Sequence, residues 1–306
     1  MEPCLRITRH GHACNVSFAS HHWRNSTFLR TTHSVSRPPN LIAAAAYGYG
    51  SSVLAPFLIS LRYSVATHVA DVILFIEPKS ARADVQQLAR THHAELLPVN
   101  ISIHRAPDGR QIRTTVPFER FLWYASACTA YSGLCLATDS RDVIFQANPF
   151  VHAVLPADAD LLLPQEEASM RIGHSPAMVY WMRKGFPGSQ RFYNRPILCA
   201  GVMLGTARGF QSLWSLMQPI YRKTATQSLE RPNDQGVLNY LYYNGSLRDV
   251  NVYMEPRGHG IVNTVGWLLM PPQGRAASPA AACIDAQDGF VYDDDGETLS
   301  PVVHRK

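Results

Sequence analysis

The sequence predicts an α/β fold built on one mixed, mostly parallel central sheet. From residue 41 onward, short apolar runs alternate with stretches of helical periodicity, which is typical of repeated βα units. With 306 residues, 46% of them hydrophobic, the chain is long enough and apolar enough to bury a substantial core. We therefore expect one globular domain over residues 40–306, preceded by a tail over residues 1–39.

The first half of this domain reads as successive βα units. Buried strands show as short apolar runs, and helices show as longer segments with apolar residues every three or four positions. A glycine loop at 47–52 separates the first strand from the first helix, and a polar turn lies at Asp108 and Gly109. We expect strands at 41–46, 71–78 and 95–100, and helices at 53–64, 80–93 and 117–133.

The second half mixes the same elements with irregular segments. Expected strands are 134–138, 159–167 and 197–205, and expected helices are 207–221 and 234–243. The segment 182–196 predicts irregular structure. From residue 251 onward we expect short strands and turns that close one edge, with a Pro/Ala-rich insert at 271–282.

Charge is concentrated at the N-terminus. Residues 1–39 hold five arginines and one acidic residue, so most of the formal charge of +5 belongs to this tail. The remaining sequence lacks a continuous Lys/Arg stripe with interleaved aromatics, which argues against a nucleic-acid partner. The six cysteines form no CxxC pair and no zinc-like spacing with histidine, so they do not define a redox compartment.

An uncharged run at 38–61 follows the basic tail and superficially resembles a membrane anchor. Gly48, Gly50 and Pro56 interrupt it, and a strand, a loop and a helix explain it better, so no transmembrane segment is expected. The tail is compatible with a transit peptide, a disordered extension or a misplaced start. The secretory-pathway lumen, the cytoplasm and an importing organelle all stay open as locations.

Two carboxylates, Asp139 and Asp142, directly follow the expected strand at 134–138. Ligands of open α/β sheets bind outside the carboxyl ends of the strands. Two anions held at one spot are costly unless a cation lies between them, and Mg²⁺ or Mn²⁺ prefers such oxygen ligands. The alternative is a polar turn in which Arg141 pairs with the aspartates.

Three blocks of sequence carry a resemblance to a known family. The stretch TDSRDVIFQ at 138–146, with NPF at 148–150, resembles the metal-binding block of GT-A nucleotide-sugar glycosyltransferases, in a form with two residues between the aspartates. The segment LCAGVMLG at 198–205 resembles a strand of glycogenin-like enzymes, although Cys199 replaces their Asn. The segment NDQGVLN at 233–239 resembles the start of their helix. The resemblance implies a single GT-A, Rossmann-like domain.

This resemblance implies roles for several residues. Asp139 and Asp142 would hold a metal ion, and a histidine in the last strand, His304 here, would be the third ligand. Asp234 would act at the sugar and Gln235 near the anomeric carbon, although Asp234 also suits a helix N-cap. Glu166 and Glu167 follow a strand on the cleft side, and either is a candidate general base or else a surface carboxylate. The donor-binding candidates are Tyr47, Gly48, Arg62, Arg141, Ala200 and Gly201, where the glycines could also serve a turn or a bulge.

We therefore expect a metal-dependent glycosyltransferase that uses Mn²⁺ or Mg²⁺. It would transfer a sugar from a nucleoside diphosphate sugar, with UDP preferred over GDP, to a hydroxyl of a glycan, protein or small molecule. The sequence does not separate retention from inversion. Two alternatives remain: a non-catalytic relative that binds a sugar or a partner, and a phosphohydrolase, whose aspartates would normally be separated by one residue.

Overall fold

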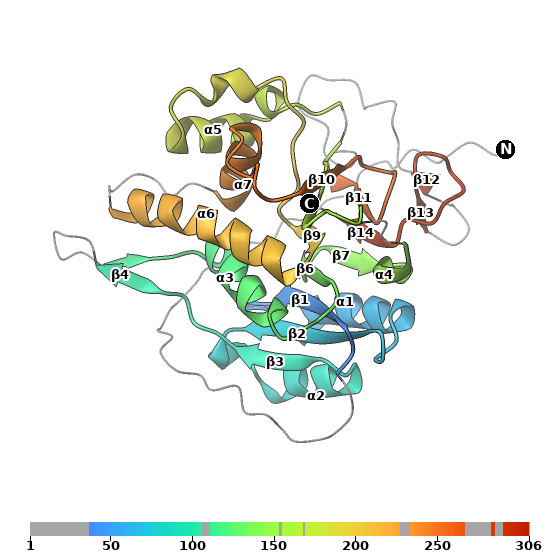
Figure 1. The fold of residues 1–306 in the computed structure, drawn as a ribbon. Helices are drawn as coiled ribbons and strands as arrows, with labels where there is room; N and C mark the ends of the chain where they lie inside the picture. The colour runs from blue at the N-terminus through green and yellow to red at the C-terminus, as the bar shows by residue number, and fades with distance from the viewer. Residues whose placement is uncertain are drawn as a thin grey trace.

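The computed structural model describes residues 37–105, 111–152, 155–167, 169–226, 233–266, 283–284 and 290–305. Figure 1 shows that these residues form an α/β molecule with helices on both sides of a central sheet. Most of the expected N-terminal tail, the turn at Asp108 and Gly109, and the insert at 271–282 lie outside the described residues. Within the described residues, no helix is both long enough and apolar enough to cross a membrane.

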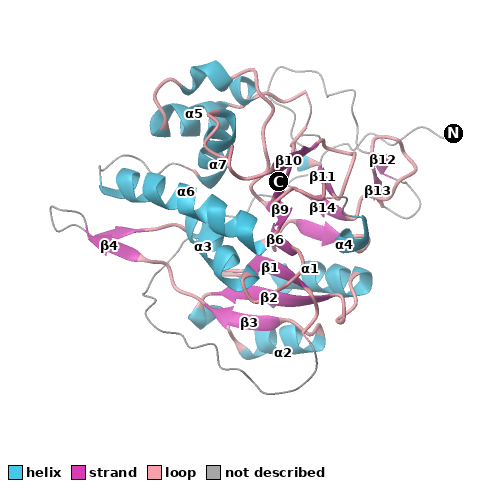
Figure 2. Cartoon of the chain, in the orientation of Figure 1, coloured by secondary structure: helices cyan, strands magenta, loops and turns pink. Residues whose placement is uncertain are grey.

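The central sheet has seven strands in the order β10-β8-β9-β6-β1-β2-β3 (Figure 2). β9 runs antiparallel to both neighbours, whereas every other adjacent pair is parallel. The expectation of an α/β fold with a mixed central sheet is therefore confirmed. The strands are β1 (Asn40–Ala45), β2 (Ala70–Ile76), β3 (Glu95–Pro98), β6 (Cys135–Asp139), β8 (Leu161–Pro164), β9 (Val202–Gly205) and β10 (Val252–Glu255).

Helices cover both faces, as the continuous apolar run of β1 requires of a strand buried on two sides. Alternate β1 residues divide between two cores: Leu41 and Ala43 face α3, α6 and α7, while Ile42 and Ala44 face α1. The helices are α1 (Ser51–Ser64), α2 (Ala83–Thr91), α3 (Val116–Cys128), α4 (Pro149–His152), α5 (Pro176–Gly185), α6 (Ala207–Thr226) and α7 (Asp234–Tyr243).

The order of the strands creates a switch point between β1 and β6. From β1 the chain proceeds through α1 to β2 on one side, and it later returns through α3 to β6 on the other side. The loops that follow β1 and β6 therefore diverge at the carboxyl edge of the sheet. Such a divergence opens a crevice at the strand ends, and this is where open α/β sheets bind ligands.

A three-stranded sheet flanks this edge in the order β11-β14-β7, from Val262–Thr264, Val302–His304 and Val143–Phe145. It packs against α1, where the rings of Phe57 and Phe145 meet edge to face with centroids 5.5 Å apart. The described residues also include the pairs β4 (Ile103–Arg105) with β5 (Gln111–Arg113) and β12 (Cys283–Ile284) with β13 (Val291–Tyr292).

Two expectations about the second half need correction. The segment 182–196 is not wholly irregular, because it contains the end of α5 and a short 3-10 helix, Ser189–Phe192. The sequence before α5 contains residues typical of a helix start. Ser175 caps the helix by accepting a hydrogen bond from the Met178 amide at 3.2 Å, and Pro176 occupies the first turn. The strand expected at 197–205 is regular only in β9. The expected closing of an edge agrees with β10, which is the edge strand of the central sheet.

Candidate metal centre

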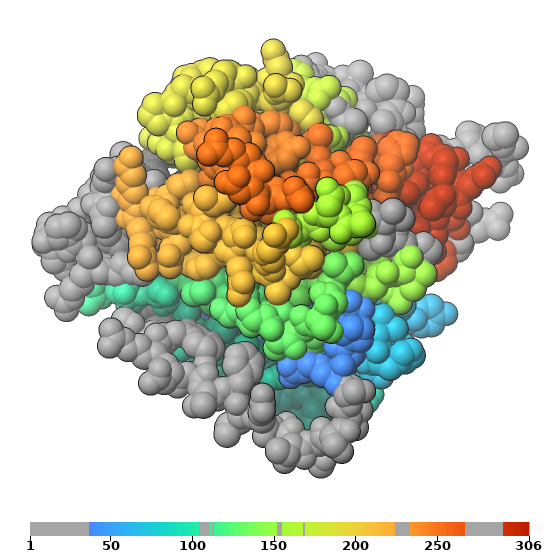
Figure 3. All heavy atoms as spheres, viewed as in Figure 1, coloured from blue at the N-terminus to red at the C-terminus, as the bar shows by residue number. Residues whose placement is uncertain are grey.

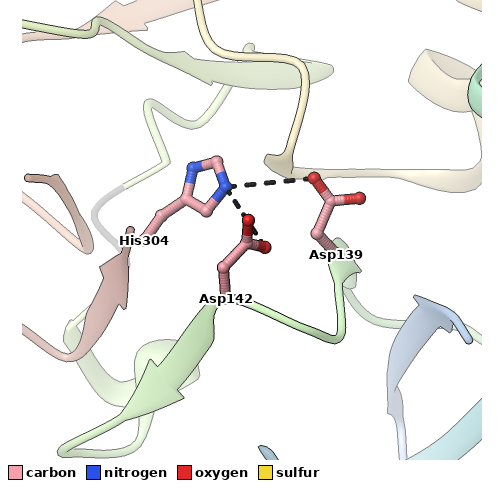
Figure 4. Close-up of side chains that lie close together, drawn as sticks. All are labelled: Asp139, Asp142 and His304. Atoms are coloured by element: carbon pink, nitrogen blue, oxygen red, sulfur yellow. Dashed lines mark ion pairs between the residues drawn. The ribbon is translucent and has the colours of Figure 1, made fainter. Parts of the chain in front are cut away.

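Asp139, Asp142 and His304 converge at the carboxyl edge of the sheet although more than 160 residues separate the histidine from the aspartates. Asp139 ends β6, and Asp142 directly precedes β7. The antiparallel pairing of β7 with β14 places His304 opposite Val143, the residue after Asp142. Figure 4 shows the imidazole pointing at both carboxylates, with Nε2 3.9 Å from Asp139 Oδ2 and 3.8 Å from Asp142 Oδ1.

The three side chains fit a divalent cation. Their ligand atoms all lie within 4.8 Å of one another, and the buried His304 Nε2 has no hydrogen-bond partner within the described residues. Ligands about 2.1 Å from an octahedral ion lie about 3.0 Å apart in cis positions and about 4.2 Å apart in trans positions. The two distances from His304 Nε2, 3.8 and 3.9 Å, fall between these values, so small side-chain rotations would bring the three atoms around one ion.

Electrostatics at the centre favour bound positive charge. Burial, followed by the negative charge of Asp139, raises the pKa of Asp142 above its ordinary value. Burial opposes the charged form of His304, but Cys199 and the two aspartates outweigh burial and raise the pKa of His304 to about 9. A cation between the carboxylates would relieve the repulsion by Asp139 that contributes to the raised pKa of Asp142, and it would take the place of the proton on His304.

Gly201 leaves the room that this centre needs. A Cβ at position 201 would lie 2.7 Å from Asp139 Oδ2 and 2.8 Å from His304 Nε2, inside the contact distance of both atoms. The glycine carbonyl accepts from the Asp139 amide at 2.7 Å, which fixes the 198–201 segment beside the end of β6. This glycine is thus required by close approach to the candidate ligands.

Cys199 supports the other side of the imidazole. Its Sγ lies 3.3 Å from His304 Nδ1, and it also accepts from the Gly201 amide at 3.3 Å. A partner at Nδ1 fixes the orientation of the ring and leaves Nε2 directed at the carboxylates. The sequence showed only that Cys199 departs from the Asn of glycogenin-like enzymes, and its contact with His304 was not anticipated.

Arg120 is a second residue that sequence reasoning missed. It is buried in α3, where its guanidinium pairs with Asp139 Oδ1 through Nη1 and with Asp234 Oδ2 at 2.6 Å through Nη2. Nη2 also donates to the Ala200 carbonyl at 2.8 Å. A signal existed, because Arg120 and Glu119 are the only charged residues in an otherwise uncharged apolar helix.

Asp234, Gln235 and Glu166 form a second set of polar groups next to the centre. The Asn233 side chain caps α7 by accepting a hydrogen bond from the Gln235 amide at 2.9 Å. The N-cap is therefore Asn233, and Asp234, the alternative candidate for this role, is the first residue of the helix. Gln235 Nε2 donates to Glu166 Oε1 at 2.6 Å and to the Leu198 carbonyl at 3.0 Å. Glu166 is 1% exposed, so it is a buried group and not a surface carboxylate.

Some of the residues expected to bind the sugar donor lie near the candidate metal centre, and others lie elsewhere. Arg141 is half exposed at the rim and lies 3.5 Å from Asp142. Gly48 turns the loop after β1 with a φ of 83°. Tyr47 is 3% exposed and stacks on Trp123 in the core, with ring centroids 6.1 Å apart. Burial raises the pKa of the neighbouring Tyr49, and the charges of Arg141, Asp139 and Asp142 also act on this group.

Arg62 lies away from the centre. Its guanidinium donates to the carbonyls of His92 at 2.7 Å and His93 at 2.7 Å, and also approaches the Ala70 carbonyl at 3.3 Å. Ala70 begins β2, so these contacts are at the amino edge of the sheet, opposite the aspartates. The expected phosphate contact of Arg62 does not agree with this location, and Arg62 instead ties α1 to the turn after α2.

Comparison with known proteins assigns no family to this sequence. The sequence matches no protein-family model and gives no significant match to a curated protein.

Proposed function

We propose that the chain is a metal-dependent glycosyltransferase of the GT-A type that uses a nucleoside diphosphate sugar. The observation that carries the proposal is the convergence of Asp139, Asp142 and His304 at the switch point between β1 and β6. A site with two carboxylates, a buried imidazole and an open strand edge suits a hard divalent ion that also binds diphosphate oxygens.

The contacts between the three resembling blocks support this proposal. Asp139 in the first block binds the Gly201 carbonyl of the second block through its amide. The Leu198 carbonyl of the second block accepts from Gln235 and from Asn239 in the third block, each at 3.0 Å. Segments about 30 to 60 residues apart in sequence therefore adjoin around one edge, as a shared site requires.

The residues of the chain would divide the work of sugar transfer. Asp139, Asp142 and His304 would hold Mn²⁺ or Mg²⁺, which when bound stabilises the negative charge of a departing diphosphate. Asp234 would accept from a donor-sugar hydroxyl while Arg120 fixes its orientation. Gln235 would line the sugar pocket, and Glu166, hydrogen-bonded to Gln235, would lie on the acceptor side.

The test is an activity assay with a panel of UDP- and GDP-sugars, with and without Mn²⁺. Release of the nucleoside diphosphate measures hydrolysis or transfer. The proposal predicts metal-dependent turnover that Asp142→Ala abolishes and that Asp249→Ala leaves intact, since Asp249 is a 90% exposed side chain outside the centre. Phosphate release from monoesters would indicate a phosphohydrolase. Sugar-nucleotide binding without turnover would indicate a non-catalytic relative, and either result would overturn the proposal.

A further inference from the structure

A group of arginines and aromatic rings lies beyond the candidate metal centre. We define the Arg195 cluster as Arg171, Arg191, Phe192, Arg195 and Tyr243. The first four belong to residues 169–226, a stretch with eight Lys or Arg residues and no Asp or Glu. Tyr243 comes from the end of α7, which packs against α5 as seen at the top of Figure 1 and in the adjoining yellow and orange surfaces of Figure 3.

The members of the cluster contact one another in a chain. The Arg195 guanidinium lies 6.0 Å from the centre of the Tyr243 ring, and the Arg191 guanidinium lies 4.7 Å from the centre of the Phe192 ring. The two rings are 6.1 Å apart. An isolated bridge pairs Arg171 with Pro196, and the Ile172 amide donates to the Arg195 carbonyl at 2.9 Å, so Arg171 and Arg195 are neighbours.

Among the described residues, no carboxylate pairs with the positive charge of the cluster. In the described part of the chain, none of the three arginines forms an ion pair with a carboxylate. Arg191 and Arg195 are exposed, and Arg171 is partly exposed. Three cations gathered without counter-charges repel one another, so an anionic ligand on this face is favoured.

The cluster lies within reach of the candidate sugar-transfer site. α7 begins at Asp234, which contacts Arg120 at the centre, and ends at Tyr243 in the cluster. At 1.5 Å per residue, the helix separates the two by about 14 Å. The segment from Arg195 to Gly201 also joins them, because the Leu198 carbonyl accepts from Gln235 and Gly201 adjoins Asp139. A ligand several sugar units long could therefore contact both places.

We infer that the Arg195 cluster binds the acceptor and that the acceptor is an acidic saccharide, with carboxylate or sulfate groups paired to these arginines. The inference rests on the proposed glycosyltransferase function. Arginine presents a planar fork of donors that matches a carboxylate or sulfate group in a two-bond geometry. A nucleic-acid strand fits less well, because Phe192 is 6% exposed and packs against Tyr243 and so offers no open ring for base stacking.

The test is calorimetric binding of an oligogalacturonate, which carries carboxylates, and of a heparin oligosaccharide, which carries sulfates. A neutral cello-oligosaccharide and oligo(dT) serve as competing ligands. Binding of at least one acidic saccharide should weaken about tenfold in Arg195→Gln and again in Arg191→Gln, which follows from the loss of a charge-assisted bond in each case. Binding should also weaken as salt rises. Arg90→Gln is the matched control, because Arg90 is an exposed arginine on the distant helix α2.

Both tested arginines are exposed, so the variants are expected to fold, and circular dichroism checks this. Equal affinity for the neutral saccharide, stronger binding of oligo(dT), or unchanged binding in the Arg195→Gln and Arg191→Gln variants would overturn the inference. The sugar-nucleotide turnover assay, with Asp142→Ala as its inactive control, separates the two proposals. If acidic saccharides bind at the cluster but no sugar-nucleotide turnover occurs, the surface is retained and the proposed function fails. If turnover occurs without such binding, the function is retained and the acceptor inference fails.

Discussion

Arg120 Nη2 lies 2.6 Å from Asp234 Oδ2, while Nη1 of the same guanidinium pairs with Asp139. One buried cation therefore joins the start of α7 to the strand end that carries the candidate metal ligand. Burial raises the pKa of Asp234 above its ordinary value, and the charge of Arg120 and its hydrogen bond oppose this shift. The metal centre and the Asp234 group are thus parts of one electrostatic unit.

Removal of Arg120 should be strongly destabilising. Arg120→Gln leaves two carboxylates without their buried counter-charge, which costs about 3–5 kcal/mol of unfolding free energy. Asp234→Asn in the Arg120→Gln background should restore part of this loss, because only Asp139 then lacks a partner. Urea unfolding of the two single variants and the double variant measures the coupling. Simple additivity of the two effects would contradict this account.

Gly201→Ala should impair metal binding more than folding. The added methyl group would occupy space 2.7 Å from Asp139 Oδ2 and 2.8 Å from His304 Nε2, so the ligands must separate. We expect Mn²⁺ affinity to fall more than about tenfold, since displaced ligands lose the geometry that the ion requires. Gly50→Ala is the control, because its Cβ would meet only the end of the flexible Arg82 side chain at 3.2 Å. Equal metal affinity of wild type and Gly201→Ala would be inconsistent with the centre.

Cys199 should act through His304 and not as a nucleophile. Cys199→Ala removes the group 3.3 Å from His304 Nδ1 and should reduce Mn²⁺ affinity by about tenfold to a hundredfold, the usual effect of losing a supporting partner. Cys199→Ser retains a hydrogen-bonding atom and should recover much of the affinity. Metal titrations of the two variants compare these outcomes. A serine variant as weak as the alanine variant would show that Cys199 supports packing alone.

Glu255 should make stability depend on pH. Burial raises its pKa from 4.5 to about 7, even though the amides of Ile261 and Val262 donate to its carboxylate at 3.0 and 3.2 Å. Because the folded pKa exceeds the unfolded one, the folded state binds the extra proton between these values, and ionisation costs stability as pH rises from about 4.5 to 7.

Glu255→Gln mimics the protonated group and should remove this dependence. Relative to the variant, the wild type should lose roughly 3 kcal/mol of unfolding free energy between pH 4.5 and pH 8. Urea unfolding at several pH values measures the difference, and subtraction of the variant cancels the contributions of other titrating groups. A constant difference across this range would show that Glu255 does not titrate as described.

The sequence was most informative where structure is local. Apolar runs predicted β1, β2 and β6, and the position of Asp139 and Asp142 at the carboxyl end of β6 follows from that strand alone. The candidate metal centre also depends on contacts between segments far apart in the sequence, and local sequence patterns do not predict such contacts. His304 reaches Asp142 only through the pairing of β14 with β7, and Arg120 reaches Asp234 across 114 residues.

Tyr47 and Arg62 show that a residue's position along the chain does not by itself predict whether its side chain lies at the site. Tyr47 follows β1 as expected, but its side chain packs into the core, where its ring stacks on Trp123. Arg62 belongs to the expected helix α1, but the direction of that helix carries its last turn to the amino edge of the sheet. Side-chain direction at the end of an element is set by tertiary packing, which the hydrophobic pattern does not specify.

The most direct test of the central claim is Mn²⁺ binding followed by electron paramagnetic resonance in the presence and absence of UDP. We predict that the wild type binds a single Mn²⁺ at this site, that UDP tightens the binding, and that Asp142→Asn and His304→Gln each weaken it at least about tenfold. Asp249→Asn, which changes a 90% exposed carboxylate, should bind as the wild type does. Mn²⁺ binding that is absent in the wild type, or unchanged in both ligand variants, would contradict a metal centre at Asp139, Asp142 and His304.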